Sequence, residues 1–563
     1  MPAAGNRRNV PPPQSQPESD VTDLDRRALV NRIDRLIAPW NGDLPGITVG
    51  VVQGGELVAH RHAGLASLEL GVRIGPETCF RIASVSKQFT CAAVLILAAR
   101  GLLDIEAPAR TLLPELPEAY AAVTVAHLMQ NTSGIRDMLE IQRQGGADLG
   151  TSVSAEDLLD GICRQATLNF APGTRYLYSN SAFFLLGLIV ERLTGRKLEA
   201  VLEEEIFVPL GMTSTRHTPD LSVPIPNLAT GYLAKNGGFV RASHGFALGG
   251  EGGLVSCVGD LALWARTAVL RRHPAGGVLD ALEKMVPFTN GRPSLYARGL
   301  LKAPYRGVLT FSHGGLWPGY RTEYLRAPSL DAAVIAISNN GAADPNLIAH
   351  RVLDVLLDRT GAVKLPKLPP AAELAPVAGR YLDPETGATV DVSVSEEGVP
   401  TLKVNGLPST AEATEDGRLA IPRSSTVFSV RAKGPDAVEV TLDAGTVSVW
   451  NRVPPGAVLP ADLPGTYASE EMASRWVIER AGEGMRVRVT GPVVRGARWE
   501  IEPIAESDVR VHVPGTLMRG WLDARVERDA GGAIAALVVN GGRAKRVRYA
   551  RRPDAPASPA AMR

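Results

Sequence analysis

The chain changes pattern near residue 361, and this change constrains its fold more than any other feature. Before it, helix-like and strand-like segments are mixed. After the linker "KLPKLPPAAELAP", short alternating runs separated by Gly, Pro and Asp continue to about residue 555, a pattern typical of all-β structure. The 563 residues exceed the ~250–300 residues of one core. We therefore expect a disordered tail at 1–24, a mixed domain at 25–365, and β-domains at 376–454 and 462–553.

The mixed domain has strand-like runs at both ends and helices between them. "GITVGVVQGGELVAHRHAGLA" predicts a hairpin that turns at Gly54-Gly55, and strand-like runs return from 306 to 339. A helix is expected over 23–40, and another after Asp344, with Pro345 at its first turn and Gly361 beyond its end. Early and late strands around a helical insert predict an α+β domain with an antiparallel sheet.

The last third of the chain contains a weak internal repeat. "AGRYLDPETGATVDVSV" and "PGTYASEEMASRWVIER" begin alike, with Gly379 and Gly465 lying 86 residues apart. Each half ends in a hairpin-like pair of runs, and "VPPGAVLPADLP" separates the halves. We expect two related small antiparallel β-barrels or sandwiches.

Composition excludes several classes of function. The formal net charge of +1 gives no whole-chain attraction to nucleic acid or to an anionic membrane. The longest apolar runs, such as "CAAVLILAA", are far shorter than the ~20 residues of a membrane span, and the first residues hold no signal-peptide core. We expect a soluble cytoplasmic protein without metal or cofactor, whose four cysteines are thiols. The basic stretch near the end is interpreted as a solvated strand face rather than a nucleic-acid site; it contains Arg543, Lys545, Arg546, Arg548, Arg551 and Arg552.

A serine and a lysine stand at the start of the apolar run in "FRIASVSKQFTCAAVLILAARG". Ser84 and Lys87 are three residues apart and share one face if the segment is helical. Burial and the helix N-terminus lower a lysine's pKa, so that the amine can accept the serine's proton. Alone, the pair is better explained by a capping serine and a lysine that reaches solvent. Ser86 lies off the lysine's face and is expected to play no catalytic part.

Two further motifs follow in the sequence. "RYLYSNSAFFLLG" places Tyr178 and Asn180 before an apolar helix, and "FSHGGLWPG" places His313-Gly314-Gly315 at the end of a strand. A tyrosine beside a cation can act as base and acid, an amide can bind a substrate carbonyl, and glycines admit a substrate backbone along an edge strand. The structural alternatives are a half-buried tyrosine, a helix cap and a strand-end turn.

Together the three motifs resemble those of the penicillin-recognising serine hydrolases, over roughly residues 25 to 361. The resemblance implies a mainly antiparallel sheet with flanking helices. "SVSKQFTCA", a histidine where other members have a lysine, and the two β-domains are most similar to the D-aminopeptidase branch. That branch carries two small β-barrels, one of which sends a loop into the active site.

The resemblance implies a role for each matched residue. Ser84 would be the acylated nucleophile, Lys87 and Tyr178 would share the proton transfers, and Asn180 would orient the acyl amide. The backbone N–H groups of Ser84 and Leu316 would form the oxyanion hole. His313 would replace a lysine that faces a substrate carboxylate, and a mostly neutral imidazole recognises a carboxylate poorly.

The implied substrate is a small peptide or amide with a free N-terminus, from which an N-terminal D-residue is released. An esterase or amidase on the same scaffold, and a catalytically idle binding module, remain as alternatives. A homodimer is one assembly open to the protein. Stereochemical preference is not set by the sequence.

The acid that would hold the substrate amine is less well defined. Asp523, within the candidate barrel loop 511–526, Glu251 in the glycine-rich stretch and Asp137 after "TSGIR" are the candidates. For each, a solvated surface carboxylate is an equally good interpretation.

Overall fold

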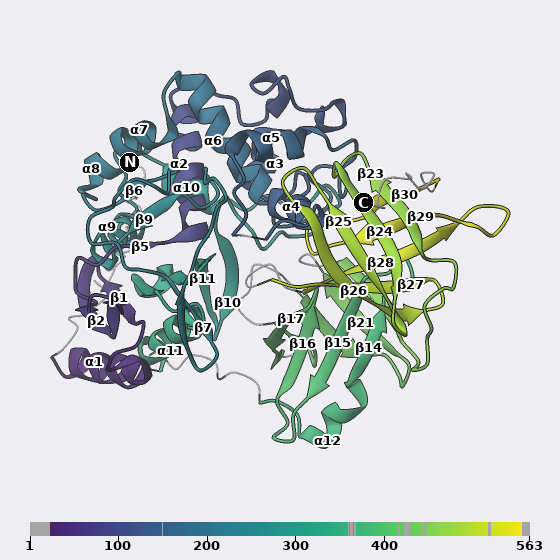
Figure 1. Ribbon diagram of the computed structural model, residues 1–563. Helices are drawn as coiled ribbons and strands as arrows, with labels where there is room; N and C mark the ends of the chain where they lie inside the picture. The colour runs from purple at the N-terminus through teal and green to yellow at the C-terminus, as the bar shows by residue number, and fades with distance from the viewer. Residues whose placement is uncertain are drawn as a thin grey trace, which may run out of the picture.

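The computed structural model describes residues 23–553, apart from 149, 359, 361–363, 365–366, 415, 422–427, 443–445 and 516–519. The expected tail therefore lies outside the described residues except for 23 and 24, where the first helix begins. Figure 1 shows a mixed helix and sheet domain, in purple to teal, beside two β-domains in green and yellow. This is the predicted α+β domain followed by two antiparallel β-domains.

The first domain is organised around a six-stranded antiparallel sheet. Its strand order is β10-β11-β12-β13-β1-β2, so strands from both ends of the domain meet in one sheet, as predicted. β1 and β2 form the expected hairpin, with Gly54 and Gly55 at φ of 56° and 82°. The strands are β1 (Ile47–Gln53), β2 (Glu56–Ala63), β10 (Leu301–Tyr305), β11 (Val308–Trp317), β12 (Tyr320–Ala327) and β13 (Ala332–Ser338).

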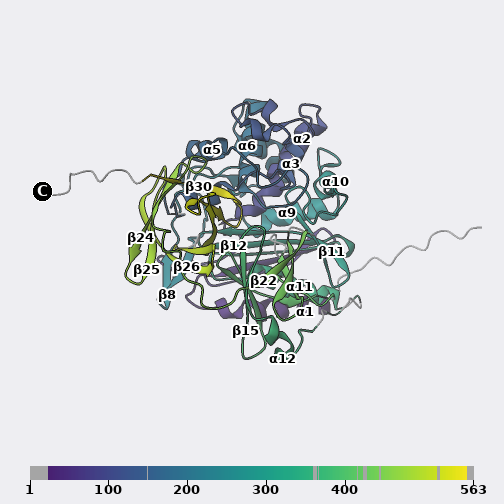
Figure 2. The same ribbon diagram turned by 90° about the vertical axis from the view of Figure 1, so that its right-hand side faces the viewer.

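Helices cover both faces of this sheet, as Figures 1 and 2 show. α1 (Asp23–Ile37) and α11 (Pro345–Leu357) pack on one face. On the other face α9 (Val258–Val269) joins the sheet to the helical insert. β13 is buried throughout because it lies between these layers. The Asp344 side chain caps α11 as predicted, whereas Gly361 lies outside the described residues.

The helical insert runs between β2 and β10. Gly101 and Gly195 follow α2 and α6 with φ of 71° and 67°, as expected for helix ends. The helices are α2 (Ser86–Ala99), α3 (Val125–Met129), α4 (Met138–Gln144), α5 (Ala155–Cys163), α6 (Asn180–Thr194), α7 (Leu198–Leu202), α8 (Val208–Leu210) and α10 (Val278–Glu283). The short strands are β3 (Leu65–Ser67), β4 (Val72–Arg73), β5 (Phe80–Arg81), β6 (Arg216–His217), β7 (Tyr232–Lys235), β8 (Gly238–Arg241) and β9 (Leu254–Ser256).

The first β-domain follows α12 (Ala371–Leu374) and is a nearly closed barrel. Its nine strands run in the order β17-β16-β15-β14-β22-β21-β20-β19-β18. The two edge strands, β17 and β18, are separated in sequence by Ala411 alone. The strands are β14 (Gly379–Leu382), β15 (Thr389–Val394), β16 (Pro400–Val404), β17 (Leu407–Thr410), β18 (Glu412–Ala413), β19 (Leu419–Ala420), β20 (Phe428–Ala432), β21 (Ala437–Leu442) and β22 (Thr446–Arg452).

The second β-domain is a closed antiparallel barrel in which each strand pairs with the next and β30 pairs with β23. Closure leaves no unpaired sheet edge. The strands are β23 (Gly465–Ser469), β24 (Ser474–Ala481), β25 (Gly484–Thr490), β26 (Arg495–Ala505), β27 (Asp508–Val513), β28 (Gly520–Arg528), β29 (Ile534–Asn540) and β30 (Val547–Arg552).

The predicted repeat is visible in matching side-chain contacts of the two β-domains. Both first strands begin at the predicted glycines. Two residues later, the Tyr381 and Tyr467 hydroxyls each donate to the carbonyl four residues upstream, at 3.0 and 2.7 Å. The guanidinium of Arg452 lies over the Tyr381 ring and that of Arg551 over the Tyr467 ring. The same contact between a tyrosine ring and an arginine guanidinium therefore joins the first and last strands of each domain.

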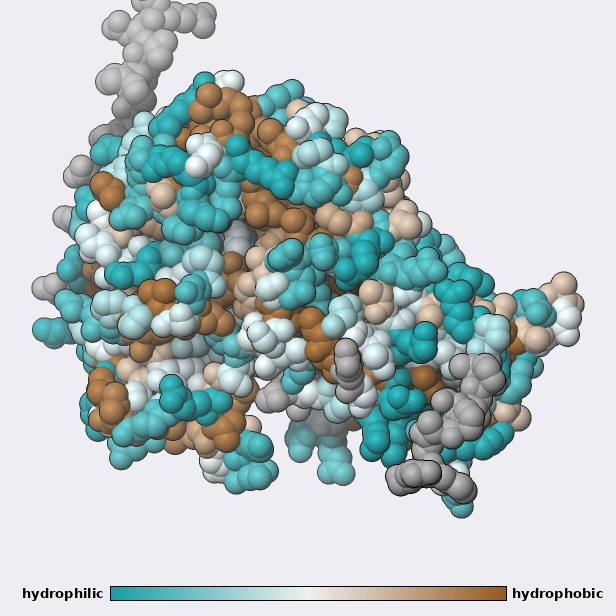
Figure 3. Space-filling model, turned by 45° about the horizontal axis from the view of Figure 1, so that its top comes forward, coloured by the Kyte–Doolittle hydropathy of each residue, from teal (hydrophilic) through white to brown (hydrophobic). Residues whose placement is uncertain are grey.

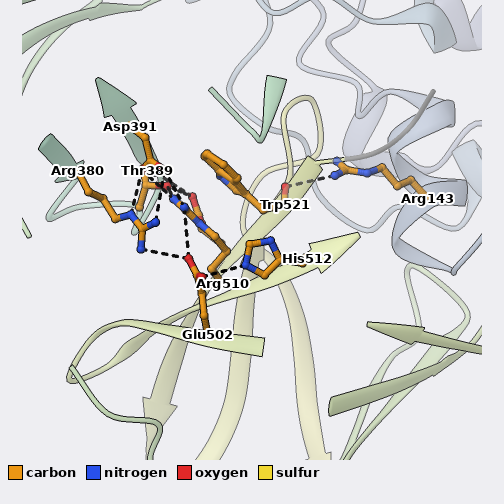
Figure 4. Close-up of polar contacts among 9 residues, drawn as sticks. Arg143, Arg380, Thr389, Asp391, Glu502, Arg510, His512 and Trp521 are labelled. Atoms are coloured by element: carbon orange, nitrogen blue, oxygen red, sulfur yellow. Dashed lines mark hydrogen bonds and ion pairs between the residues drawn. The ribbon is translucent and has the colours of Figure 1, made fainter. Parts of the chain in front are cut away.

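A buried ionic cluster joins the two β-domains (Figure 4). Arg510 of β27 contacts Asp523 of its own barrel at 3.2 Å and Asp391 of the other at 3.1 Å. Its guanidinium lies 3.5 Å from the centroid of the Trp521 ring. Asp523 also accepts hydrogen bonds from the Thr389 amide and hydroxyl. Because buried charges are stable only when paired, this cluster fixes one barrel against the other.

The surface drawn in Figure 3 is mostly hydrophilic, with apolar side chains gathered in separate patches. Among the described residues, no helix has the length and apolar character needed to cross a membrane. All four cysteines are free thiols, as predicted.

Candidate active site

The candidate nucleophile lies on a tight turn that leads into α2. Ser84 belongs to the 3-10 turn Ala83–Val85, which directly precedes the helix, and not to the helix itself, where the sequence pattern predicts it. Ala83 has φ of 49°, a conformation that a non-glycine residue holds only when its surroundings enforce it. Ser86 provides part of that enforcement, since its hydroxyl donates to the Ala83 carbonyl at 2.6 Å and accepts from Leu254 N at 3.1 Å.

Lys87 is fully buried and directs its amine at Ser84. Nζ lies 3.0 Å from Ser84 Oγ, 2.9 Å from Asn180 Oδ1 and 2.6 Å from the carbonyl oxygen of Glu251. Those two carbonyl oxygens only accept hydrogen bonds, so a neutral amine gives them its two protons and turns its lone pair toward Ser84. Burial is the main cause that lowers the Lys87 pKa from 10.5 to about 7. The amine is therefore suited to accept the Ser84 proton near neutral pH.

This lowered pKa predicts the pH dependence of the reaction. Only the neutral amine accepts a proton, so kcat/KM should rise with pH through about 7 and level off above it. Below that value it should fall about tenfold per pH unit. The measurement is kcat/KM between pH 5 and 9 in buffers of constant ionic strength; a flat profile would contradict Lys87 as the base.

Tyr178 and Asn180 lie beside the lysine. Lys87 Nζ lies 4.9 Å from the centroid of the Tyr178 ring. Burial raises the pKa of Tyr178, while the Arg543 charge and a hydrogen bond from Ser84 oppose that rise. The phenol therefore keeps its proton at neutral pH and can donate it. Asn180 is the first residue of α6, and its amide is held by Asp137 Oδ2 at 2.9 Å.

The strand β11 forms the other wall of the site. β10 pairs with β11 only as far as Ser312, so the edge of residues 313–317 faces the cleft. Gly315 has no side chain for a steric reason, because a β-carbon there would come within 2.3 Å of the Ile82 carbonyl oxygen. This close approach brings β11 against the turn that carries Ser84. Leu316, whose N–H is the predicted second donor of the oxyanion hole, lines the cleft and is 56% exposed.

His313 is buried and neutral. Its Nδ1 lies 2.7 Å from the Gly314 carbonyl oxygen, which can only accept, so Nδ1 carries the proton. Nε2 then accepts from the Tyr296 hydroxyl at 2.9 Å. Burial, and secondarily the charge of Lys87, lowers the His313 pKa to about 3. With both nitrogens engaged, His313 supports the strand and offers no charge to a substrate.

All three domains line the cleft that contains Ser84, which has a volume of about 990 Å³. The first domain supplies Ser84, Tyr178, Asn180 and the strand residues 313–316, whereas Lys87 lies behind this lining. The β-domains supply Leu407, Pro408, Thr410, Gly542 and Arg543. A second hollow of about 660 Å³, lined by Lys302 and Phe311, contains none of the candidate catalytic residues. Among the described residues, no group of three His, Cys, Asp or Glu is placed to hold a metal.

Comparison with known proteins places this arrangement in a family. The beta-lactamase family matches residues 29–357, more than half of the chain. The chain belongs to the beta-lactamase family. It is thus an enzyme of the penicillin-recognising serine hydrolase type, as the motifs predicted.

This member of the beta-lactamase family is similar to two D-aminopeptidases. It is 30% identical over 535 residues to that of Cereibacter sphaeroides, covering 94% of this chain and 99% of the other. It is 30% identical over 458 residues to that of Gluconobacter oxydans, covering 78% and 82%. The first match extends through both β-domains.

Solved structures share the fold. An octameric penicillin-binding protein homologue from Pyrococcus abyssi has a TM-score of 0.53 and 22% identity, covering 76% of this chain and all of that one. A D-amino acid amidase from Ochrobactrum anthropi SV3, complexed with D-phenylalanine, has a TM-score of 0.52 and 23% identity, covering 60% and 100%. At these identities the likeness concerns the fold alone.

The three candidate acids of this beta-lactamase family member are all buried, so the surface interpretation is wrong for each. Asp137 caps α4 and holds Asn180, and Asp523 joins the two barrels. Glu251 Oε1 accepts from Gly249 N at 2.9 Å, and burial raises the pKa of the carboxyl. Residues 516–519, the middle of the expected barrel loop, lie outside the described residues.

Two residues of the cleft were missed. Glu323 is 1% exposed, and its carboxylate lies 3.1 Å from where a Gly314 β-carbon would be, because it stands opposite Gly314 in the β11–β12 register. Arg543 enters the cleft from the loop between β29 and β30, which corrects its interpretation as a solvated strand residue. The Asn-Gly-Gly turn before it was the available signal.

Proposed function

We propose that this serine hydrolase is an aminopeptidase that releases N-terminal D-residues, such as D-Ala, from short peptides, amides and esters. The observation that carries the proposal is the contact of 3.0 Å between the buried Lys87 amine and Ser84, in a chain similar to a D-aminopeptidase over 94% of its length. The three-domain lining of the cleft favours small substrates.

The proposed mechanism has an acyl-enzyme intermediate. Neutral Lys87 takes the Ser84 proton as Oγ attacks the acyl carbon, and the N–H groups of Ser84 and Leu316 bind the oxyanion. Tyr178 gives its proton to the leaving nitrogen as the C–N bond breaks, and regains a proton from Lys87. Water then attacks the ester of Ser84 and releases the amino acid, with the same groups returning the proton to Oγ.

A free substrate amine fits the acidic side of the cleft. The carboxylate of Glu323 lies beside the strand edge along which the substrate would bind. Asp137 is less suited, since its oxygens already accept hydrogen bonds from Leu139, Glu140 and Asn180. We infer that Glu323 is the acceptor of the α-ammonium group.

Hydrolysis of anilides tests this function. D-alanine p-nitroanilide should be cleaved with a kcat/KM at least ~100-fold above that of its L-enantiomer and of N-acetyl-D-alanine p-nitroanilide, because either change leaves a buried polar group of the site unpaired. The measurement is release of nitroaniline under identical conditions.

Each other result has a distinct meaning. Equal cleavage of the free and acetylated substrates would replace the aminopeptidase with a general amidase or esterase. Absence of both turnover and labelling by a phosphonate probe would indicate an idle module.

A further inference from the structure

Among the described residues, the cleft contains a guanidinium that the catalytic steps do not use, that of Arg543. We propose that Arg543 binds the carboxylate of the leaving amino acid, so that the preferred substrates are short peptides in which a D-residue precedes one residue with a free C-terminal carboxylate. This inference rests on the proposed aminopeptidase function and names its substrate class.

Within the part of the chain that the structure describes, the Arg543 guanidinium donates no hydrogen bond, unlike those of the other arginines that line the cleft. Arg143 donates to Glu140 at 2.7 Å and to the Trp521 carbonyl at 3.3 Å. Arg321 donates to the carbonyl oxygens of Trp317 and Tyr320. The acid nearest to the Arg543 guanidinium is Asp137, at 3.9 Å, which is beyond hydrogen-bond distance. The Asp137 oxygen concerned already accepts from the backbone and side chain of Asn180.

The backbone around Arg543 is fixed by the first domain. Its N–H donates to Glu140 Oε2 at 3.2 Å, and its carbonyl accepts from Asp137 N at 3.2 Å and from Asn169 Nδ2 at 3.1 Å. Gly541 must lack a side chain, because a β-carbon there would lie 2.8 Å from the Glu140 carboxylate. Glu140 is in turn held by Arg143, whose second contact is the Trp521 carbonyl shown in Figure 4. The guanidinium is thus placed in advance of binding, which reduces the entropy cost of recognition.

The position of Arg543 selects the leaving side of the substrate. Its guanidinium carbon lies 4.6 Å from the centroid of the Tyr178 ring, and Tyr178 is the proposed donor to the leaving nitrogen. In a leaving amino acid, the carboxylate carbon is two bonds, or about 2.5 Å, from that nitrogen. A carboxylate so close to the phenol comes within reach of the planar guanidinium, which binds carboxylates with two parallel hydrogen bonds.

The strand residue expected to face a carboxylate offers no competing charge. His313 has both ring nitrogens engaged, by Gly314 and Tyr296. A carboxylate bound there would meet a neutral ring, whereas at Arg543 it would meet a permanent cation. The second β-domain therefore supplies the charge that the first domain lacks.

The experiment compares two substrates that differ only in charge, D-alanyl-L-alanine and its C-terminal amide. Wild-type enzyme should prefer the acid. Arg543→Gln should lower kcat/KM for the acid about 10- to 100-fold, mainly through KM, as expected for loss of a charged bidentate hydrogen bond. The amide should change less than ~3-fold. Arg543→Lys should restore part of the preference, and Arg548→Gln, on an exposed face of β30, should leave both substrates unchanged.

Three results would overturn the inference. An equal loss for both substrates, with a shifted acid limb of the pH profile, would make Arg543 an electrostatic partner of Tyr178 and Lys87. An equal loss with a lower melting temperature would make it structural. A wild-type enzyme that cleaves D-alanine p-nitroanilide but does not prefer D-alanyl-L-alanine to its amide would contradict the inference. The proposed function would then still stand.

The inference can also be tested without turnover. Calorimetric binding of the dipeptide acid and amide to Ser84→Ala protein, with and without Arg543→Gln, gives the same comparison. An acid preference that depends on Arg543 would support the inference, and its absence would overturn it. Failure of the wild type to cleave any D-alanyl substrate would separately overturn the proposed function.

Discussion

Replacing Ser84 with alanine should lower kcat for D-alanine p-nitroanilide by at least ~10⁴-fold and abolish covalent labelling by a phosphonate. The acyl-enzyme route requires Oγ, and removing a serine nucleophile leaves only the contributions of binding and the oxyanion hole. Ser86 cannot take over this role, because its hydroxyl is bonded to Ala83 O and Leu254 N. Intact-mass spectrometry of the labelled protein and initial rates are the measurements.

Ser86→Ala is the matched control for that variant. Its hydroxyl is buried and bonded on both sides, so the loss should destabilise the fold by about 1–3 kcal/mol while labelling at Ser84 persists. If Ser84→Ala retained activity and Ser86→Ala abolished labelling, the assignment of the nucleophile would be reversed.

Replacing Lys87 with methionine should lower kcat/KM by about 10²- to 10⁴-fold, the usual contribution of a positioned general base. The same variant should lose a pH dependence of stability. The folded-state pKa of Lys87 is about 7 against 10.5 when exposed, so the unfolded chain binds more protons between these values. The wild-type free energy of unfolding therefore rises from pH 7 to 10.5, by on the order of 5 kcal/mol from this group.

Denaturant unfolding of wild type and Lys87→Met at pH 7 and pH 9.5 measures this difference. The methionine variant should show the smaller rise. Lys235→Met is the control, because Lys235 is exposed on β7 and should change neither the slope nor the activity. A wild-type protein whose free energy of unfolding changes between pH 7 and pH 9.5 by the same amount as that of the variant would contradict a depressed Lys87 pKa.

The proposed catalytic residues could be located from the sequence because they lie in short motifs. Ser84 and Lys87 are three residues apart, and Tyr178 and Asn180 are two apart, so local helix and turn geometry nearly fixes each pair. The pairs meet because α6 packs against α2 and β11 packs against the turn that carries Ser84, and the glycine at 315 permits the approach of β11. The order of the motifs was enough to predict their meeting, although their distances were not.

The acids and Arg543 were not predictable in the same way. Asp137, Glu251 and Asp523 are single residues in polar stretches, and such stretches are usually exposed. Their burial results from contacts with distant partners, such as Asn180 for Asp137 and Arg510 for Asp523. Arg543 lies in a run of basic residues whose pattern resembles a solvated strand. Only packing of the last barrel against α4 brings that one side chain into the cleft.

The loop that carries Arg543 also has a consequence for how the enzyme is made. Its contact with Glu140 joins residues 403 positions apart in the chain. During synthesis the amino-terminal domain emerges first and can collapse on its own core, with Ser84 and Lys87 already assembled. The wall that contains Arg543 forms only after nearly the whole chain has left the ribosome. Folding intermediates would thus carry the proposed nucleophile before they carry the guanidinium that lies by the Tyr178 ring. Docking of the last barrel would be the step at which the proposed selectivity arises.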